Sequence, residues 1–415
     1  MSELAYRAPA CTICALPHDV LTQLVAKLDL IDKFRFGGVN RRFRRAFKSP
    51  AVWRRVQIGG SGYVNGLLRR IYRVALAGLE HLVIRDADLT SCAFGVAVRA
   101  AANFPLPRLA TITLGGAGYY TAVPHVRLPT EELMQTMRLA RATFPALLRV
   151  NIECVFVVSK HTYSSGLLAL LVELQATGLT LCTSKFRITC WPRTPAERAA
   201  LVQFIDAQEL VTRVFLEAQP ATEEDNEVAR ALAARGLCNL RVTLFDRDDP
   251  LPLSQGFLDA CFSSPHLEDT FVHGADLRGC TWPACATRAR SLTVSRCVVD
   301  DALCGSLPRT LDSLALPQTV VTQSRALCEY VASAERLAYV CVCDLRCEHG
   351  RRRDLMRATL EGKAMMRVDA THLFLDAQDL AVVSLMTERR ITVRVDRRFA
   401  PGQEHRGCNA CLVLV

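Results

Sequence analysis

The sequence predicts an α/β chain in which a small three-helix module is followed by a curved solenoid of parallel strands. Half of its 415 residues are apolar and 22% are charged, a composition that buries a large core. Apolar residues recur at helical spacing near the N-terminus. From Leu79 onward a short strand pattern instead returns at intervals of roughly 20 to 40 residues. This change of period predicts the order of the two parts.

The first helix of the module is predicted to begin near Pro17 and Asp19. Proline lacks the amide donor that a first helical turn leaves unpaired, and a carboxylate faces the positive end of the helix dipole. The apolar residues that follow share one helical face, and they are Val20, Leu21, Leu24, Val25 and Leu28.

Two more helical segments are predicted. An apolar turn at 31–36 is expected to be broken or bent by Gly37-Gly38. A third helix, ended by Ser49-Pro50, is predicted from a stripe of three apolar residues, Val39, Phe43 and Phe47. Trp53 then supplies a large apolar anchor. Three short helices bury little surface, so such a module needs a partner or the domain behind it.

The order of these features resembles the F-box. Members of that family open with Leu-Pro and an acidic residue, continue with leucines at helical spacing and a Val-polar-Arg step, and end in an aromatic residue. The resemblance covers about a tenth of the chain, and Gly37-Gly38 and Phe43 depart from it. It implies docking onto a Skp-type adaptor held by a cullin scaffold, through contact residues Leu16, Pro17, Asp19, Leu21, Leu24, Leu28, Val39 and Trp53. The alternative is that these residues form the core of a helical cap on the repeats.

The strand pattern consists of an apolar residue, two others, an apolar residue, one other and an apolar residue. Because a strand alternates faces, the last two apolar positions point into a core. The pattern spans 79–84, 109–114, 147–152, 211–216, 237–244, 267–272, 289–294, 311–316 and 371–375. Helices are predicted between strands, from Thr194, and over 223–234, 130–142 and 352–363. The region resembles the irregular leucine-rich repeats found behind F-boxes; an α/β domain of unrelated strands is the alternative.

Residues between the inward positions are expected to face outward onto the concave sheet, where a protein substrate would bind. The predicted substrate-binding residues are Arg85, Asn151, Glu217, Arg241, Phe271 and His273, accompanied by Thr113, Ser295 and Asp376. Phe271 is the most informative of them, because a large apolar side chain rarely faces water without a reason.

The net charge of +10 is concentrated. Between Lys33 and Leu79 there are twelve Lys or Arg and no Asp or Glu. Such a block predicts an acidic partner, either a protein surface or nucleic acid. RNA binding through this block is the weaker interpretation. Two further basic runs, at 351–353 and 389–398, could touch RNA or acidic proteins, but they lack the interleaved exposed aromatic residues on which bases stack.

Signals for catalysis are poor, and no catalytic residue, cofactor or metal is predicted. The sequence lacks a GxxxxGK loop, a GxGxxG loop and a His-Glu-x-x-His motif. Zinc-like spacings occur at Cys11/Cys14 and Cys408/Cys411, and a denser group comprises Cys341, Cys343, Cys347 and His349. We interpret most of the 18 cysteines as reduced, buried thiols.

The sequence predicts neither a membrane helix nor a signal peptide, so we expect a cytoplasmic or nuclear protein. The predicted organisation is a tail at 1–15, an F-box at 16–58, a linker or cap at 59–78, a leucine-rich-repeat solenoid at 79–400 and a tail at 401–415. This predicts a non-catalytic, substrate-recruiting subunit of an SCF-type ubiquitin ligase. The alternative is a leucine-rich-repeat scaffold with a degenerate F-box in a structural assembly, independent of ubiquitin.

Overall fold

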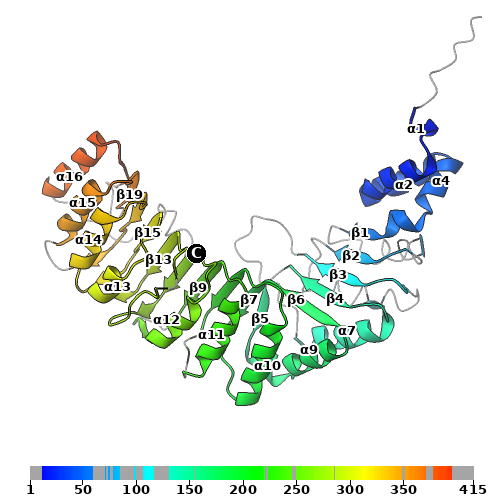
Figure 1. Ribbon diagram of the computed structural model, residues 1–415, viewed down its shortest axis with the longest axis horizontal. Helices are drawn as coiled ribbons and strands as arrows, with labels where there is room; N and C mark the ends of the chain where they lie inside the picture. Colours follow the sequence, from blue (N-terminus) through cyan, green and yellow to red (C-terminus); the bar gives the residue numbers. More distant parts are fainter. Residues whose placement is uncertain are drawn as a thin grey trace, which may run out of the picture. The chain divides into compact units, whose positions relative to one another are not determined.

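The computed structural model shows helices and parallel strands in alternation (Figure 1). It describes residues 12–58, 71, 73–74, 78–84, 98–99, 106–115, 130–153, 155–218, 220, 223–244, 249–284, 286–347, 351–370 and 377–394. The chain divides into two compact units, Met1–Phe156 with Ser164–Thr183 and Val157–Tyr163 with Ser184–Val415. No helix within the described part of the chain is long and apolar enough to cross a membrane.

The helical module opens the first unit. It consists of α1 (Thr12–Ala15), α2 (His18–Lys27), α3 (Leu30–Val39), α4 (Arg41–Phe47) and the 3₁₀ turn η1 (Pro50–Trp53). The predicted helix near Pro17 is present as α2. The expected break at Gly37-Gly38 is wrong, because α3 runs through both glycines and ends at Val39. Asn40 separates α3 from α4, and its side chain accepts a hydrogen bond from the Phe43 amide at 2.9 Å.

The first unit continues as a parallel sheet in the order β1-β2-β3-β4-β6. The predicted strands within 79–84, 109–114 and 147–152 are confirmed. The strands are β1 (Arg55–Ile58), β2 (His81–Ile84), β3 (Thr111–Leu114), β4 (Arg149–Ile152) and β6 (Thr180–Thr183), and the helices are α7 (Thr130–Thr143) and α9 (Leu167–Ala176). In β3 the last two apolar residues, Ile112 and Leu114, are fully buried, as the alternation predicts.

The second unit is built on a ten-stranded sheet in the order β20-β19-β17-β15-β13-β11-β9-β8-β7-β5. Its strands are β5 (Phe156–Val158), β7 (Lys185–Ile188), β8 (Arg213–Leu216), β9 (Asn239–Thr243), β11 (Asp269–His273), β13 (Ser291–Ser295), β15 (Ser313–Ala315), β17 (Tyr339–Cys341), β19 (Arg367–Asp369) and β20 (Thr392–Arg394). β5 and α8 (Lys160–Ser164) each cross the unit boundary by one residue. The predicted strands within 211–316 are confirmed, and the motif at 371–375 lies outside the described residues.

Helices lie along one side of this sheet, and the opposite side is called the strand face below (Figure 1). The helices are α10 (Pro195–Asp206), α11 (Asp225–Ala234), α12 (Gln255–Cys261), α13 (Asp301–Gly305), α14 (Arg325–Ser333), α15 (Arg351–Glu361) and α16 (Ala377–Glu388). A second sheet is formed by two-residue strands, β10 (Leu251–Pro252), β12 (Ala275–Asp276), β14 (Val298–Val299), β16 (Val320–Val321) and β18 (Arg346–Cys347). The predicted start at Thr194 is confirmed by a capping box between Thr194 and Glu197.

Consecutive repeats of the second unit are joined by a recurring backbone contact. The Cys238 carbonyl accepts hydrogen bonds from the amides of Glu268 and Asp269, at 2.9 and 3.1 Å. The Glu268 carbonyl accepts in the same way from Arg290 and Ser291, at 2.8 and 3.0 Å. This contact fixes the start of each strand against its neighbour and so helps to keep the strands in register.

A left-handed residue recurs at the turn between the two sheets. Gly274, Arg296, Gln318 and Asp344 all have positive φ, between 49° and 72°. The register of β12, β14, β16 and β18 places these four residues at equivalent points of successive repeats. Only the first is glycine, and there a β carbon would collide with the Leu244 carbonyl oxygen. The same left-handed turn therefore recurs in four successive repeats.

Candidate docking surfaces

The aromatic core of the module holds two of the residues that were predicted to contact an adaptor. Trp53 is fully buried, and its indole Nε1 donates a hydrogen bond to the Phe47 carbonyl at 2.6 Å. The rings of Phe34 and Phe47 lie 5.7 and 5.0 Å from the Trp53 ring. Leu21 is also fully buried. Their side chains therefore stabilise the module and offer no surface to a partner.

Lys33, the first cation of the basic block, also lies in this core. It is 4% exposed, and its Nζ donates to the Val52 carbonyl at 3.3 Å. The same Nζ stands 5.8 Å from the centroid of the Trp53 ring. Burial lowers the pKa of Lys33, and Asp29 partly opposes that effect. Lys33 therefore belongs to the packing of the module and not to its charged surface.

The module leaves several large apolar side chains in contact with water. Leu24 is 41% exposed, Ile31 63% and Val39 64%, and Ile13 on α1 is 43% exposed. Pro17 and Asp19 are also exposed, whereas Leu16 and Leu28 are half-buried. Leu24 and Val39 were predicted from the sequence as contact residues, whereas Ile13 and Ile31 were not. These four apolar side chains are therefore individually exposed in the part of the module that the structure describes.

Several cations of the module are exposed as well. Arg35, Arg41, Arg44, Arg45 and Lys48 are all exposed on α3, α4 and the turn after it. Arg35 pairs with Asp32 across one helical turn at 3.2 Å, a contact too exposed to contribute much stability. The module therefore exposes both large apolar side chains and positively charged ones.

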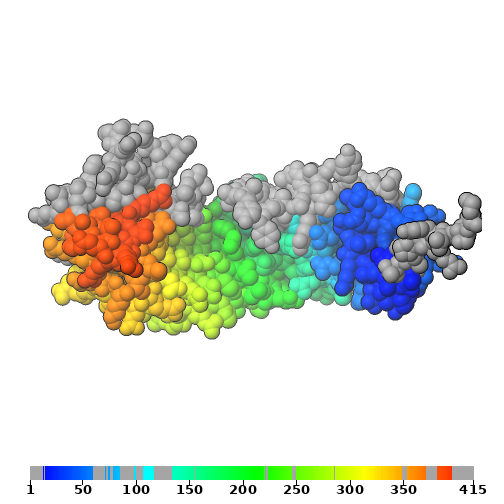
Figure 2. All heavy atoms as spheres, turned by 90° about the horizontal axis from the view of Figure 1, so that it is seen from above, coloured from blue at the N-terminus to red at the C-terminus, as the bar shows by residue number. Residues whose placement is uncertain are grey.

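The second candidate surface is the strand face of the second unit. Figure 2 shows the molecule from the side on which this face lies. Arg187 on β7 forms an ion pair with Glu217 at 2.7 Å, and both side chains are less than 20% exposed. The guanidinium carbon of Arg241 on β9 stands 4.4 Å from the centroid of the Phe271 ring. The first contact joins β7 to the residue that follows β8, and the second joins β9 to β11.

Phe271 is packed on its own strand face and does not face open water. Its ring is stacked on His273 at 6.1 Å with planes 8° apart, and only 9% of the residue is exposed. His273 Nδ1 lies 3.3 Å from the Ser295 hydroxyl oxygen. Burial, together with Arg296 and Arg241, lowers the pKa of His273 to about 4, so the ring is neutral at pH 7.

The predicted binding residues do not all come together. Glu217, Arg241, Phe271 and His273 share the strand face of the second unit. Asn151 belongs to the first unit, where its amide donates to the Thr113 hydroxyl at 3.2 Å and accepts from Arg149 at 2.7 Å. Arg85 and Asp376 lie outside the described residues.

Of the cysteine group, two members lie close together. The Cys341 and Cys343 sulfur atoms are 3.4 Å apart and fully buried, and Cys343 Sγ lies 3.6 Å from the Asp369 carbonyl oxygen. Cys347 is half-buried, and His349 lies outside the described residues, as do Cys11, Cys408 and Cys411. Among the residues that are described, no three His, Cys, Asp or Glu side chains are grouped as metal ligands.

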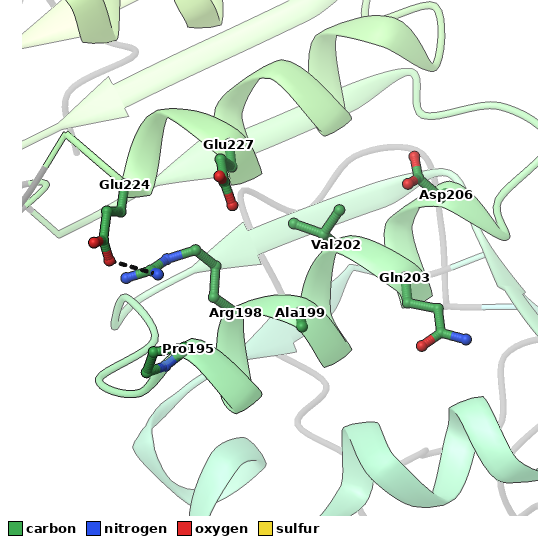
Figure 3. A pocket seen from close by; sticks show the side chains of 8 residues that line it. All are labelled: Pro195, Arg198, Ala199, Val202, Gln203, Asp206, Glu224 and Glu227. Carbon is green, nitrogen blue, oxygen red and sulfur yellow. Dashed lines mark ion pairs between the residues drawn. The ribbon is translucent and has the colours of Figure 1, made fainter.

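A hollow of about 640 Å³ lies on the helical side, between α10 and the start of α11 (Figure 3). Arg198 and Glu224 point toward one another across it and form an ion pair at 2.6 Å. The residues that line it include no hydroxyl, thiol or imidazole side chain.

Comparison with known proteins agrees with the architecture of the N-terminal module. Residues 13–55 match the F-box domain. Among solved structures, the chain is similar to the crystal structure of an internalin from Listeria monocytogenes, with 10% sequence identity and a TM-score of 0.41, over 85% of this chain and 90% of that chain. No curated protein matches the chain. The helical module that opens this chain is therefore an F-box domain, and a series of parallel strands follows it.

Proposed function

We propose that this chain recruits protein substrates to an SCF-type ubiquitin ligase, without a catalytic step of its own. The F-box would dock onto a Skp-type adaptor held by a cullin, and the repeats would hold the substrate. The observation that carries the proposal is the exposure of large apolar side chains on the F-box, where Ile31 and Val39 are more than 60% exposed.

An adaptor would cover this surface. Burying the exposed parts of Leu24, Ile31 and Val39 contributes about 1–2 kcal/mol each by the usual area relation. The exposed cations of α4 would add electrostatic steering toward an acidic adaptor, which speeds encounter more than it prolongs the complex. Apolar contacts would therefore set the lifetime of the complex, and salt would mainly affect its formation.

Two substitutions test the apolar surface without opposing the helix dipole. Ile31→Asp places a carboxylate in the first turn of α3, and Val39→Lys places a cation at its end, where each charge is favoured. We expect each to weaken binding of the full chain to a purified Skp-type adaptor by roughly 5- to 30-fold, the equivalent of 1–2 kcal/mol. The matched control is Leu148→Asp, because Leu148 is a further large apolar residue of the first unit and is 59% exposed. Unchanged affinity for both F-box variants would exclude this surface as the docking site.

A further inference from the structure

Arginine greatly outnumbers lysine in this chain, and the imbalance lies mainly in the repeats. The sequence holds 45 arginines and 6 lysines. Within 16–58, three of the ten Lys and Arg residues are lysines, whereas at 59–415 only three of forty are. A uniform bias in composition would lower the share of lysine equally in both parts. Lysine is therefore scarcer in the repeats than such a bias explains.

Some exposed arginines occupy positions where the fold does not require a guanidinium. Arg325 pairs with Glu329 through one nitrogen at 2.8 Å, and the arginine side chain is 79% exposed. Arg336 pairs with Asp312 in the same manner at 3.2 Å and is 55% exposed. A lysine ammonium forms such single contacts as well, and exposed pairs contribute little stability in either case. Packing therefore does not explain why these two residues are arginines.

Lys363 shows that lysine fits the same place in a repeat. It follows α15 in the turn before β19, as Arg336 follows α14 in the turn before β17. Its Nζ lies 3.4 Å from Glu335 Oε1, and the two side chains are 69% and 78% exposed. The pair is too exposed to hold the amine firmly. Lys363 therefore offers an accessible primary amine.

Two exposed amines remain on the repeats. Lys160, the first residue of α8, is exposed like Lys363, whereas Lys185 on β7 is half-buried. These three are the lysines of the whole segment 59–415. A lysine amine is a nucleophile once it has released its proton, but a guanidinium stays protonated in proteins. The repeats thus present few groups that can accept an acyl group.

We infer that the arginine-rich repeats resist ubiquitin transfer to the chain itself, and that Lys160 and Lys363 are the acceptor sites they retain. The inference rests on the proposed function, since the ligase would bring a ubiquitin thioester close to the repeats. In that transfer the lysine Nζ attacks the thioester carbonyl carbon and gives up one proton to water. The C–N isopeptide bond forms, the C–S bond breaks, and the sulfur leaves as a thiolate. Few acceptors on the chain leave the amines of a bound substrate as the favoured targets.

The test uses the full chain with a flexible, lysine-containing tag at its C-terminus. It is assembled with the adaptor, the cullin, the activating and conjugating enzymes, ATP and ubiquitin that lacks lysines, so each acceptor takes one ubiquitin. Mass spectrometry compares transfer to the repeats with transfer to the tag. The triple variant Arg230→Lys, Arg325→Lys and Arg336→Lys raises the exposed amines on the repeats from two to five. We expect transfer to the repeats to rise roughly twofold or more, in line with that count.

Matched variants separate acceptor chemistry from charge. The same three arginines changed to glutamine should leave transfer to the repeats at the wild-type level. Lys160→Arg with Lys363→Arg keeps both charges and should lower that transfer by roughly fivefold or more. Equal transfer to the lysine and glutamine variants, or wild-type transfer to the double arginine variant, would overturn the inference. A tag that stays unmodified, or loss of adaptor binding, contradicts the proposed function, whereas a modified tag with either of those results contradicts only the present inference.

Discussion

Gly37 faces the ring of Phe47, and a β carbon on Gly37 would stand 2.7 Å from the Cγ atom of that ring. The ring has little freedom to move, since Phe34 lies 5.4 Å from it and Trp53 5.0 Å. The glycine therefore permits α3 and α4 to pack closely, although glycine usually weakens the interior of a helix. Its neighbour Gly38 has no atom within 4 Å of such a carbon.

The two glycines make a matched pair of substitutions. We expect Gly37→Ala to lower the free energy of unfolding by about 1–3 kcal/mol, because the added methyl group overpacks the aromatic core. Gly38→Ala should be neutral or stabilising by up to about 1 kcal/mol, as alanine favours helix. Denaturant unfolding, followed by a probe in the F-box, measures both. Equal effects of the two substitutions would contradict the close packing of α3 on Phe47.

Phe271 is expected to matter for stability as well as for binding. Its ring lies beneath Arg241 and against His273, and 9% of the residue is exposed. Phe271→Ala should therefore lower the stability of the second unit by about 1.5–3 kcal/mol. Phe271→Leu, which keeps most of the apolar volume but removes the stacking, should cost less than half as much. An unchanged melting temperature for Phe271→Ala would show that the ring is open to water after all.

His273 makes the second unit sensitive to acid. The pKa of His273 is about 4 in the folded chain and near 6.5 when it is unperturbed. At a pH between these two values, the imidazole therefore binds a proton in the unfolded chain but not in the folded chain. The free energy of unfolding should therefore fall as the pH drops from about 6.5 to about 4, and this contribution should level off below that range.

The contribution of His273 is isolated by comparing variants across that pH range. His273→Asn should show a shallower loss of stability between pH 7 and pH 5 than the wild type. Ser295→Ala removes only the hydroxyl 3.3 Å from Nδ1 and should keep the wild-type slope, because burial is the largest cause of the shift. Parallel slopes for wild type and His273→Asn would contradict a neutral, buried imidazole.

Local periodicity predicted much of the fold. The strands β8, β9 and β13 were predicted because each carries two inward apolar residues, and β11 was predicted although Thr270 fills one of its two inward positions. β7 was missed because it begins directly after β6, so its two inward residues, Phe186 and Ile188, do not stand out in the sequence as a separate strand. The continuous α3 was missed because the reason for Gly37 lies ten residues away, at Phe47.

The candidate surfaces were less predictable than the fold. Leu24 and Val39 belong to the exposed apolar set, but Leu21 and Trp53 have the same chemistry and lie in the core. Helical spacing identifies an apolar face without saying whether the chain itself or a partner covers it. The contacts that Arg187 and Arg241 make on the strand face depend on the register of neighbouring strands, which no single stretch of sequence encodes.

The most direct test of the proposed function is a calorimetric titration of the wild-type chain with a purified Skp-type adaptor at moderate salt. We expect one-to-one binding with a Kd of about 1 μM or tighter, weakening as salt rises because the exposed arginines of α4 assist association. Limited proteolysis of the same sample reports whether residues 12–58 are folded. A folded F-box that gives no binding would contradict the ligase assignment and favour a scaffold in a structural assembly.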